Sequence, residues 1–129
     1  MALQLSVHHI AIIASNYAKS KVFYTDVLGA RIIHETYRAE RDSYKLDLAL
    51  ADGVQIELFS FPAPPARPTQ PEACGLRHLA FGVDDIESAV NYLSEHGIAC
   101  EPIRIDPITA RAYTFFKDPD NLPLELYQK

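Results

Sequence analysis

The sequence predicts an α+β fold made of two copies of one β-α-β-β-β module. In each half, a histidine near the start of an apolar run is followed by a glutamate in the last such run. These pairs are His9 with Glu57 and His78 with Glu125, separated by 57 − 9 = 48 and 125 − 78 = 47 residues. Self-similarity over a long period indicates duplicated units. We therefore expect one domain, residues 1–129, with modules 5–61 and 75–128 joined by a linker over residues 62–74.

The elements of the first module follow from its apolar periodicity. Residues 5–14 form a strand-like run, and Asn16 then offers an N-cap for a helix over residues 17–28 that ends at Gly29. Strands are expected over residues 31–38, 41–50 and 54–59, the last two joined by a hairpin turn at Asp52-Gly53.

The second module repeats this order after a Pro-rich stretch. Five prolines between residues 62 and 71 cannot pair in a sheet interior, so this stretch is predicted to link the modules. A strand is expected over residues 76–83, then a helix capped by Asp84 or Asp85 that ends at Gly97. Three more strands are expected over residues 98–105, 109–117 and 122–127, with a turn at residues 118–121.

Composition favours a soluble protein with a single domain. The chain is 48% hydrophobic, which is enough to bury a core. Its net charge of −5 and dispersed cations argue against a nucleic-acid or membrane surface, and the longest apolar run, residues 10–14, is too short to span a bilayer. Since Cys74 and Cys100 are its only cysteines, no disulfide framework is predicted and the cytoplasm is the expected location.

Strand alternation places both glutamates on the face of the sheet that points away from the helix. Ile56 and Leu58 share one side of their strand and Glu57 lies on the other, where a carboxylate is costly unless it is paired or ligated. The residues expected on the same face, which could bind substrate or simply be solvated, are Arg41, Ser43 and Lys45 in the first module and Arg111 and Tyr113 in the second. Cationic side chains there could clamp a carboxylate or phosphate, so we expect a small, anionic substrate.

The two histidine–glutamate pairs predict a metal site. Alternation alone does not choose between His8 and His9, but the repeat aligns His9 with His78. Taken singly, a histidine in an apolar strand is more often a hydrogen-bonded core residue, and this is the interpretation for His34 and His96, which have no counterpart. Two imidazoles and two carboxylates at matching positions instead favour one divalent ion, which could be Zn, Ni, Co, Mn or Fe.

At these residues the chain resembles the vicinal oxygen chelate superfamily, which includes glyoxalase I and extradiol dioxygenases. The resemblance covers the whole chain, and the motifs that carry it are His9-Ile10-Ala11-Ile12, Phe23-Tyr24, Leu28-Gly29, Ile56-Glu57-Leu58, Gly75-Leu76-Arg77-His78-Leu79-Ala80, Asp118-Pro119-Asp120-Asn121 and Leu124-Glu125-Leu126. Two further motifs, Phe59-Ser60-Phe61-Pro62 and Pro71-Glu72-Ala73-Cys74-Gly75, resemble more narrowly those of bacterial YaeR-type glyoxalase I-like proteins. The resemblance implies paired modules that form a cup-shaped mixed sheet around one metal, with the helices on the outer face.

The resemblance also implies an activity. Its ligand set, His9, Glu57, His78 and Glu125, is that of glyoxalase I, a metal-dependent lyase that chelates adjacent substrate oxygens and moves a proton through an enediolate. Glu125 is then the favoured base, with Glu57 as the second catalytic carboxylate. A homodimer is expected, because small modules need partners to cover their edges. The alternatives are a non-haem Fe(II) dioxygenase and a drug- or metabolite-binding module without turnover.

The chain differs from bacterial glyoxalase I at two positions that bind the substrate in that enzyme. Bacterial glyoxalase I has an arginine four residues after its first ligand histidine and an asparagine four residues after its first ligand glutamate, and both bind glutathione. This chain has Ile13 and Phe61 at these positions. The resemblance therefore carries over the proton transfer but not the use of glutathione.

Overall fold

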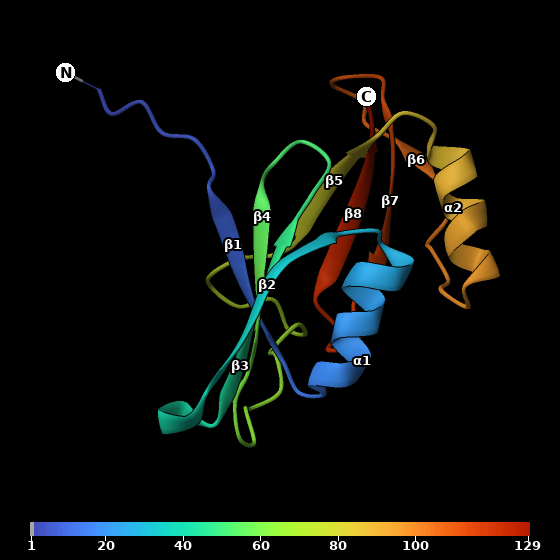
Figure 1. Ribbon diagram of the computed structural model, residues 1–129. Helices are drawn as coiled ribbons and strands as arrows, with labels where there is room; N and C mark the ends of the chain where they lie inside the picture. Colours follow the sequence, from blue (N-terminus) through green and yellow to red (C-terminus); the bar gives the residue numbers. More distant parts are fainter. Residues whose placement is uncertain (1) are drawn as a thin grey trace. The chain divides into compact units, whose positions relative to one another are not determined.

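The computed structural model describes residues 2–129 and divides them into two compact units, one ending at Ala66 and the other running from Arg67 to Lys129. Each unit contains one four-stranded sheet, with strand orders β1-β4-β3-β2 and β5-β8-β7-β6 (Figure 1). In each sheet the first strand pairs in parallel with the last, and the remaining pairs are antiparallel. The predicted α+β fold of two β-α-β-β-β modules is confirmed.

The first unit contains β1 (His9–Ala14), α1 (Tyr17–Val22), a π-helical turn (Phe23–Val27), β2 (Arg31–Arg38), a 3-10 turn (Ala39–Arg41), β3 (Ser43–Ala49) and β4 (Gln55–Ser60). The second contains β5 (Leu79–Val83), α2 (Ile86–Glu95), β6 (Arg104–Ile105), β7 (Ala112–Lys117) and β8 (Pro123–Gln128). No helix in the described residues is long and apolar enough to cross a membrane.

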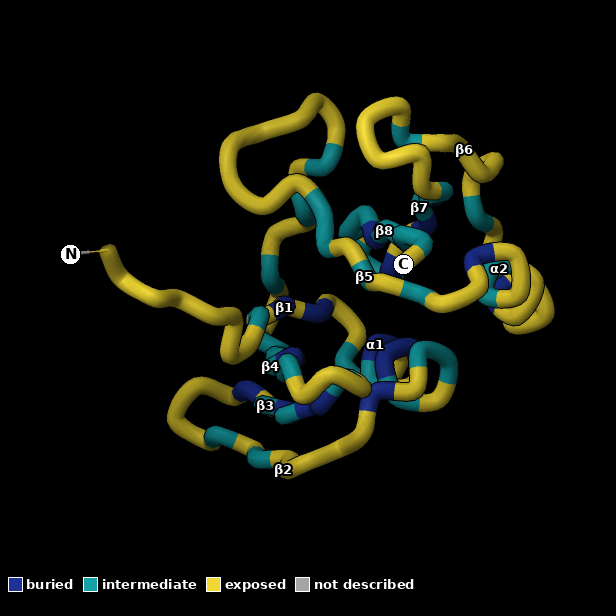
Figure 2. The backbone as a smooth tube through the Cα atoms, turned by 90° about the horizontal axis from the view of Figure 1, so that it is seen from above, coloured by how far each residue is buried: buried dark blue, intermediate teal, exposed yellow. Residues whose placement is uncertain are grey.

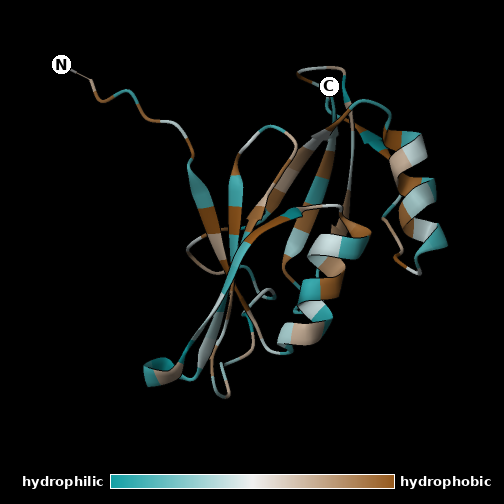
Figure 3. Cartoon of the chain, in the orientation of Figure 1, coloured by the Kyte–Doolittle hydropathy of each residue, from teal (hydrophilic) through white to brown (hydrophobic). Residues whose placement is uncertain are grey.

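Alternation along the inner strands separates an apolar face from a polar one in both sheets. Four side chains of β3 and β4 are fully buried on the apolar face of the first sheet, Leu46, Leu48, Ile56 and Leu58. In the second sheet the buried side chains of the apolar face are Thr114, Phe116, Leu124 and Leu126. The buried stretches in Figure 2 lie largely along these strands and α1, and the hydropathy in Figure 3 changes from residue to residue along them. The opposite faces are therefore free to carry the charged residues.

The two helices begin at side-chain caps. Asn16 accepts a hydrogen bond from the backbone amide of Lys19, at 3.1 Å, and Asp85 accepts one from that of Ser88, also at 3.1 Å. Asp85, not Asp84, is thus the cap of α2. The first helix widens into the π-helical turn Phe23–Val27 and ends at Gly29, whose φ of 80° suits a residue without a Cβ.

Replacing Asn16 with Ala is expected to lower the free energy of unfolding by about 1 kcal/mol, because the amide of Lys19 loses its acceptor. Urea unfolding followed by circular dichroism measures this. Asn16→Ser, which retains a capping oxygen, should stay close to the wild type; equal losses in the two variants would contradict the capping role.

A contact at the surface links α1 to β2 of its own sheet and makes the stability of the first unit depend on acid. The Tyr17 hydroxyl donates to Glu35 Oε2, and Lys21 Nζ lies 2.9 Å from the same oxygen. These contacts, that of Tyr17 foremost, hold the pKa of Glu35 below its ordinary value. Because the pKa is lowered in the folded state, Glu35 stabilises the folded protein at pH values above the ordinary carboxyl pKa of about 4.3. This stabilisation is lost as the pH falls through the folded-state pKa.

We therefore expect Tyr17→Phe to raise the pKa of Glu35 toward the ordinary value and to weaken the dependence of stability on acid. Side-chain carboxyl NMR titration reads the pKa directly. Tyr92→Phe, which removes a hydroxyl from the other unit, serves as the control. An ordinary pKa for Glu35 in the wild-type protein would contradict the argument.

Several strands are shorter than expected, for local reasons. Residues 5–8 precede β1, because its partner β4 begins at Gln55, whose amide bonds to His8 O at 3.1 Å. Residues 98–103 are not a strand; Pro102 has no amide to donate, and the amide of Glu101 reaches Phe115 O at 2.9 Å. Residues 76–78 likewise precede β5, whose partner β8 begins with Pro123.

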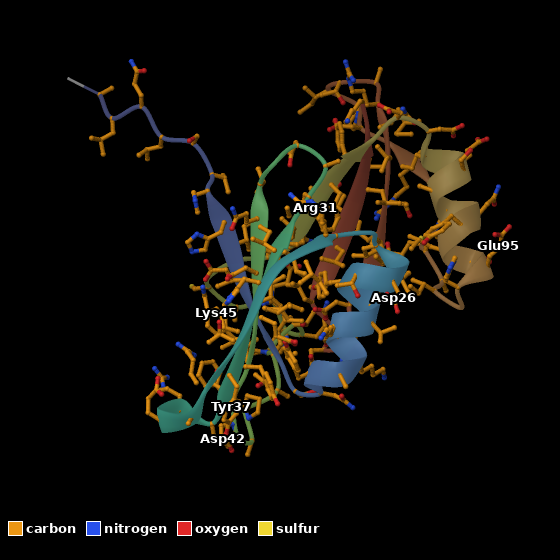
Figure 4. The ribbon with its side chains drawn as sticks, viewed as in Figure 1. Asp26, Arg31, Tyr37, Asp42, Lys45 and Glu95 are labelled. Atoms are coloured by element: carbon orange, nitrogen blue, oxygen red, sulfur yellow. The ribbon has the colours of Figure 1, made fainter. Side chains whose placement is uncertain are left out.

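Two predicted substrate residues consequently lie outside the strands to which the sequence assigned them. Arg41 ends the 3-10 turn Ala39–Arg41, and the chain enters β3 only after Asp42, which adopts φ 46°. The Tyr37 hydroxyl donates to Asp42 Oδ1 at 2.6 Å and fixes this turn (Figure 4). Arg111 immediately precedes β7, in a turn where Ala110 has φ 61°.

Candidate metal centre

In the first unit, His9 and Glu57 face each other on the polar side of the sheet. His9 Nε2 lies 3.4 Å from Glu57 Oε2. The strand register explains the contact: Glu57 is opposite Ala11 in the parallel β1–β4 pair, and His9 lies on the same face two residues earlier. The carboxylate is largely buried, with 15% of its side chain exposed, so it needs a partner.

The second unit repeats this arrangement. His78 Nε2 lies 3.2 Å from Glu125 Oε1, and 12% of the glutamate side chain is exposed. Glu125 is opposite Ala80 in the β5–β8 pair, and His78 again precedes this residue by two. His78 lies just before β5 instead of inside the expected strand, yet the geometric relation is the one found for His9.

The donor atoms of each pair are spaced as metal ligands are. Ligand atoms bound about 2.0–2.2 Å from one ion, at angles of about 90–110°, are about 2.8–3.6 Å apart. The observed nitrogen–oxygen distances of 3.4 Å and 3.2 Å fall in this range. Within the described residues no three His, Cys, Asp or Glu side chains form a possible metal-binding group, so each unit supplies a pair of candidate ligands.

The second nitrogen of each histidine also has a partner. His9 Nδ1 lies 2.8 Å from His8 Nδ1, which can accept its proton and so leave Nε2 free to ligate. His78 Nδ1 lies 3.3 Å from Arg77 Nη1, and the His78 ring contacts Phe115 edge-on, with centroids 5.1 Å apart. Because a guanidinium can only donate, ligation through Nε2 of His78 requires this contact with Arg77 to open.

The two glutamates differ in their other charged neighbours. Lys45 Nζ lies 2.9 Å from Asp47 and 3.9 Å from Glu57, so Glu57 shares its surroundings with an ammonium group (Figure 4). Among the described residues, Glu125 has an ion pair within 4.0 Å only with His78, and it interacts with Arg77 over a longer distance.

The structure places the other predicted substrate residues in different surroundings. Lys45 lies on the polar face with Glu57, whereas Ser43 is fully buried and accepts a hydrogen bond from Arg38 Nη2 at 3.0 Å, so it holds Arg38 in place. Arg41 lies over Phe61, 5.1 Å from the ring centroid. In the second unit, Tyr113 stacks on Tyr127 with centroids 6.4 Å apart, and Arg111 is exposed.

A repeated arginine–aromatic contact was missed by the sequence analysis. Arg38 lies 5.0 Å above the Phe59 ring in the first unit, and Arg104 lies 5.1 Å above Tyr113 and 5.8 Å from Phe115 in the second. Phe59 and Phe115 each lie on the polar face beside the glutamate of their unit. The alternating aromatic residues Tyr113 and Phe115 of β7, and Phe59 two residues after Glu57, could have indicated aromatic surfaces beside the glutamates, but the position of each arginine depends on the neighbouring strand.

Paired β-α-β-β-β units, each with one histidine–glutamate pair, define a class of duplicated metal-binding fold. The family model described as Glyoxalase/Bleomycin resistance protein/Dioxygenase superfamily matches residues 6–126. The chain belongs to this superfamily, as the resemblance of its motifs predicts.

Close relatives extend over nearly the whole chain. The uncharacterized protein YaeR of Escherichia coli is 63% identical over 123 residues, covering 95% of both chains. The uncharacterized protein YwkD of Bacillus subtilis is 62% identical over 124 residues, covering 96% of this chain and 97% of that protein. A glyoxalase family protein of Enterococcus faecalis has a TM-score of 0.88 at 49% identity and covers 95% of this chain and 96% of its own.

More distant relatives show that functions vary. A 2-epi-5-epi-valiolone epimerase of Actinomyces sp is 28% identical over 95% of this chain and 78% of its own length. The fosfomycin resistance protein FosX of Listeria monocytogenes shares the fold, with a TM-score of 0.72 at 19% identity over 97% of this chain and 93% of its own, and its structure contains Mn(II) and 1S,2S-dihydroxypropylphosphonic acid. Proteins similar to this chain thus include an epimerase, and proteins with its fold include one whose structure contains Mn(II).

Proposed function

We propose that the protein is a metal-dependent lyase or isomerase of the glyoxalase I type, acting on a small anionic substrate that carries two adjacent oxygens. The observation that carries this proposal is the repeated pair of facing donors, His9 with Glu57 and His78 with Glu125. Together these four side chains would hold one divalent ion without thiolate, as Zn, Ni, Co, Mn and Fe accept.

The bound ion would supply Lewis acidity, which stabilises negative charge on the adjacent substrate oxygens. Side chains of the protein would transfer the proton and bind the substrate. Glu125 Oε1 takes the proton from one substrate carbon and returns it to the neighbouring carbon, so no proton is gained or lost overall. Lys45, Arg41 and Arg111 would draw an anionic substrate toward the centre through their positive charge, and Tyr113 would provide a flat surface beside the bound molecule.

The proposed centre needs both pairs, so we propose that they meet either within one chain or across a homodimer. Light scattering of the metal-loaded protein at micromolar concentration tests the arrangement across a homodimer, which a metal-bound monomer would exclude. A monomer that still binds one ion per chain would place the whole centre in one chain, and a dimer with one ion per chain would support exchange of ligands between protomers.

The test of the function is a screen of the protein loaded separately with each metal against 2-oxoaldehydes, alone and with several thiols. Reactions run in D₂O and followed by NMR should show exchange or transfer of the proton next to the carbonyl. Oxygen consumption with Fe(II) would instead select a dioxygenase. Tight binding without turnover that survives removal of the metal would select a binding module.

A further inference from the structure

The second unit contains a cavity of about 330 Å³ that the proposed metal centre does not use. It is lined by the loop over residues 67–77, by Glu101 and by Arg104 of β6, and by residues 115–117 of β7 and Pro123 of β8. A volume of this size suits a small ligand or one end of a larger one.

The cavity is positively charged within an acidic protein. Six of its lining residues are charged, Arg67, Glu72, Arg77, Glu101, Arg104 and Lys117, which gives 4 − 2 = +2. The whole chain has a net charge of −5. A local reversal of charge inside a concave surface attracts anions.

One arginine is fixed as part of the wall. Arg67 Nη2 donates to Leu76 O at 2.6 Å and to Arg77 O at 3.3 Å, while its Nε is buried and has no hydrogen-bond partner among the described residues. A buried donor without a partner is unusual, and an oxyanion in the cavity could reach this nitrogen only if the Arg67 side chain moved.

The other cations are available to a ligand. Arg77 lies 2.5 Å from Glu72 and Arg104 lies 3.0 Å from Glu101, but these side chains are between 51% and 63% exposed, so each ion pair is weak. Lys117 has no ion-pair partner in the described part of the chain and is exposed. A ligand oxyanion can therefore bind Lys117 directly and displace a carboxylate from an arginine.

Phe115 connects this cavity to the histidine–glutamate pair of the same unit. Its ring lines the cavity, contacts His78 at 5.1 Å between centroids, and lies 5.8 Å from the Arg104 guanidinium. It is also paired with Glu125 across β7 and β8. A molecule whose anionic end occupies the cavity would thus extend past Phe115 to His78 and Glu125.

We propose that this cavity, which we call the Arg67–Lys117 pocket, binds the oxyanion group, carboxylate or phosphate, of a substrate whose reacting end lies at His78 and Glu125. The pocket itself needs no metal, whereas its role in orienting a substrate rests on the proposed function. The proposal names a substrate class: short molecules with an oxyanion at one end and two adjacent oxygens at the other.

The test is an NMR titration of the full-length, metal-free protein with inorganic phosphate and, separately, with succinate, at low ionic strength. Binding should shift the amide signals of Arg67, Phe115 and Lys117, and the anion that binds more tightly identifies the group. Lys117→Gln should weaken binding roughly tenfold, as expected for the loss of one charge-assisted hydrogen bond. Glu101→Gln should tighten it, because a competing carboxylate is gone.

Lys19→Gln is the matched control, since it removes the same charge from an exposed position on α1 in the other unit. Equal weakening by Lys19→Gln and Lys117→Gln, or no shift at the three amides with either anion, would overturn the proposal. Because these measurements need neither metal nor turnover, a protein that binds phosphate here but catalyses no proton transfer would retain the pocket and lose only the proposed function.

Discussion

Replacing Glu125 with Gln is expected to abolish turnover while leaving much of the metal affinity. An amide oxygen can still ligate, but the side chain can no longer accept a proton. The loss of a general base costs roughly 10²–10⁴-fold in rate. Glu125 is the favoured base because the resemblance to glyoxalase I assigns this role to its position; in agreement with that, Glu57 has an ammonium group, that of Lys45, at 3.9 Å, whereas the ion pair of Glu125 is with His78.

Glu57→Gln is the matched comparison, since it makes the same chemical change in the equivalent strand of the other unit. It should retain more activity than Glu125→Gln, and both variants should be assayed for kcat and for bound metal on the same preparations. Wild-type turnover by Glu125→Gln would mean that Glu57 is the base or that the reaction involves no proton transfer.

Replacing His9 or His78 with Ala is expected to lower metal affinity by more than about 100-fold. Losing a residue that only supports a ligand typically costs 10–100-fold, and losing the ligand itself costs more. Both replacements should act similarly, because the two histidines have the same register relation to their glutamates. Calorimetric titration of the metal-free protein with Zn²⁺ or Ni²⁺ measures the effect.

His34→Ala and His96→Ala are the controls for loss of an imidazole elsewhere. His34 contacts Thr36 Oγ1 at 3.0 Å, and His96 contacts Tyr92 O at 2.8 Å near the end of α2. Both variants should bind metal as the wild type does. If one ligand histidine could be removed without effect, the ion would not be shared by both pairs.

The homologous positions of the two pairs were predictable from the sequence because duplication repeats both spacing and register. A separation of 48 or 47 residues carries no geometry by itself. It becomes informative because parallel pairing of the first and last strands in each module sets His9 beside Glu57 and His78 beside Glu125. The helix caps and the apolar faces of β3, β4 and β8 were predictable for similar reasons, since capping and alternation are local.

The limits of the strands were not predictable in this way, because they depend on the partner strand. Apolar runs over residues 5–8 and 98–103 look like strands, yet pairing stops at Gln55 in one case and is interrupted at Pro102 in the other. The same effect moves Arg41 and Arg111 into turns.

Sequence alone thus determined the duplicated α+β fold, the family and the four candidate ligands, because each is encoded by periodicity or by a repeated spacing. Only the tertiary structure determined the surroundings of those ligands. The contacts of His8 with His9, Arg38 with Phe59 and Arg104 with Phe115 were decided there. The Arg67–Lys117 pocket also depends on the tertiary structure. Its charged residues are up to 50 positions apart and follow no repeat, and they come together because the loop over residues 67–77 lies beside β7.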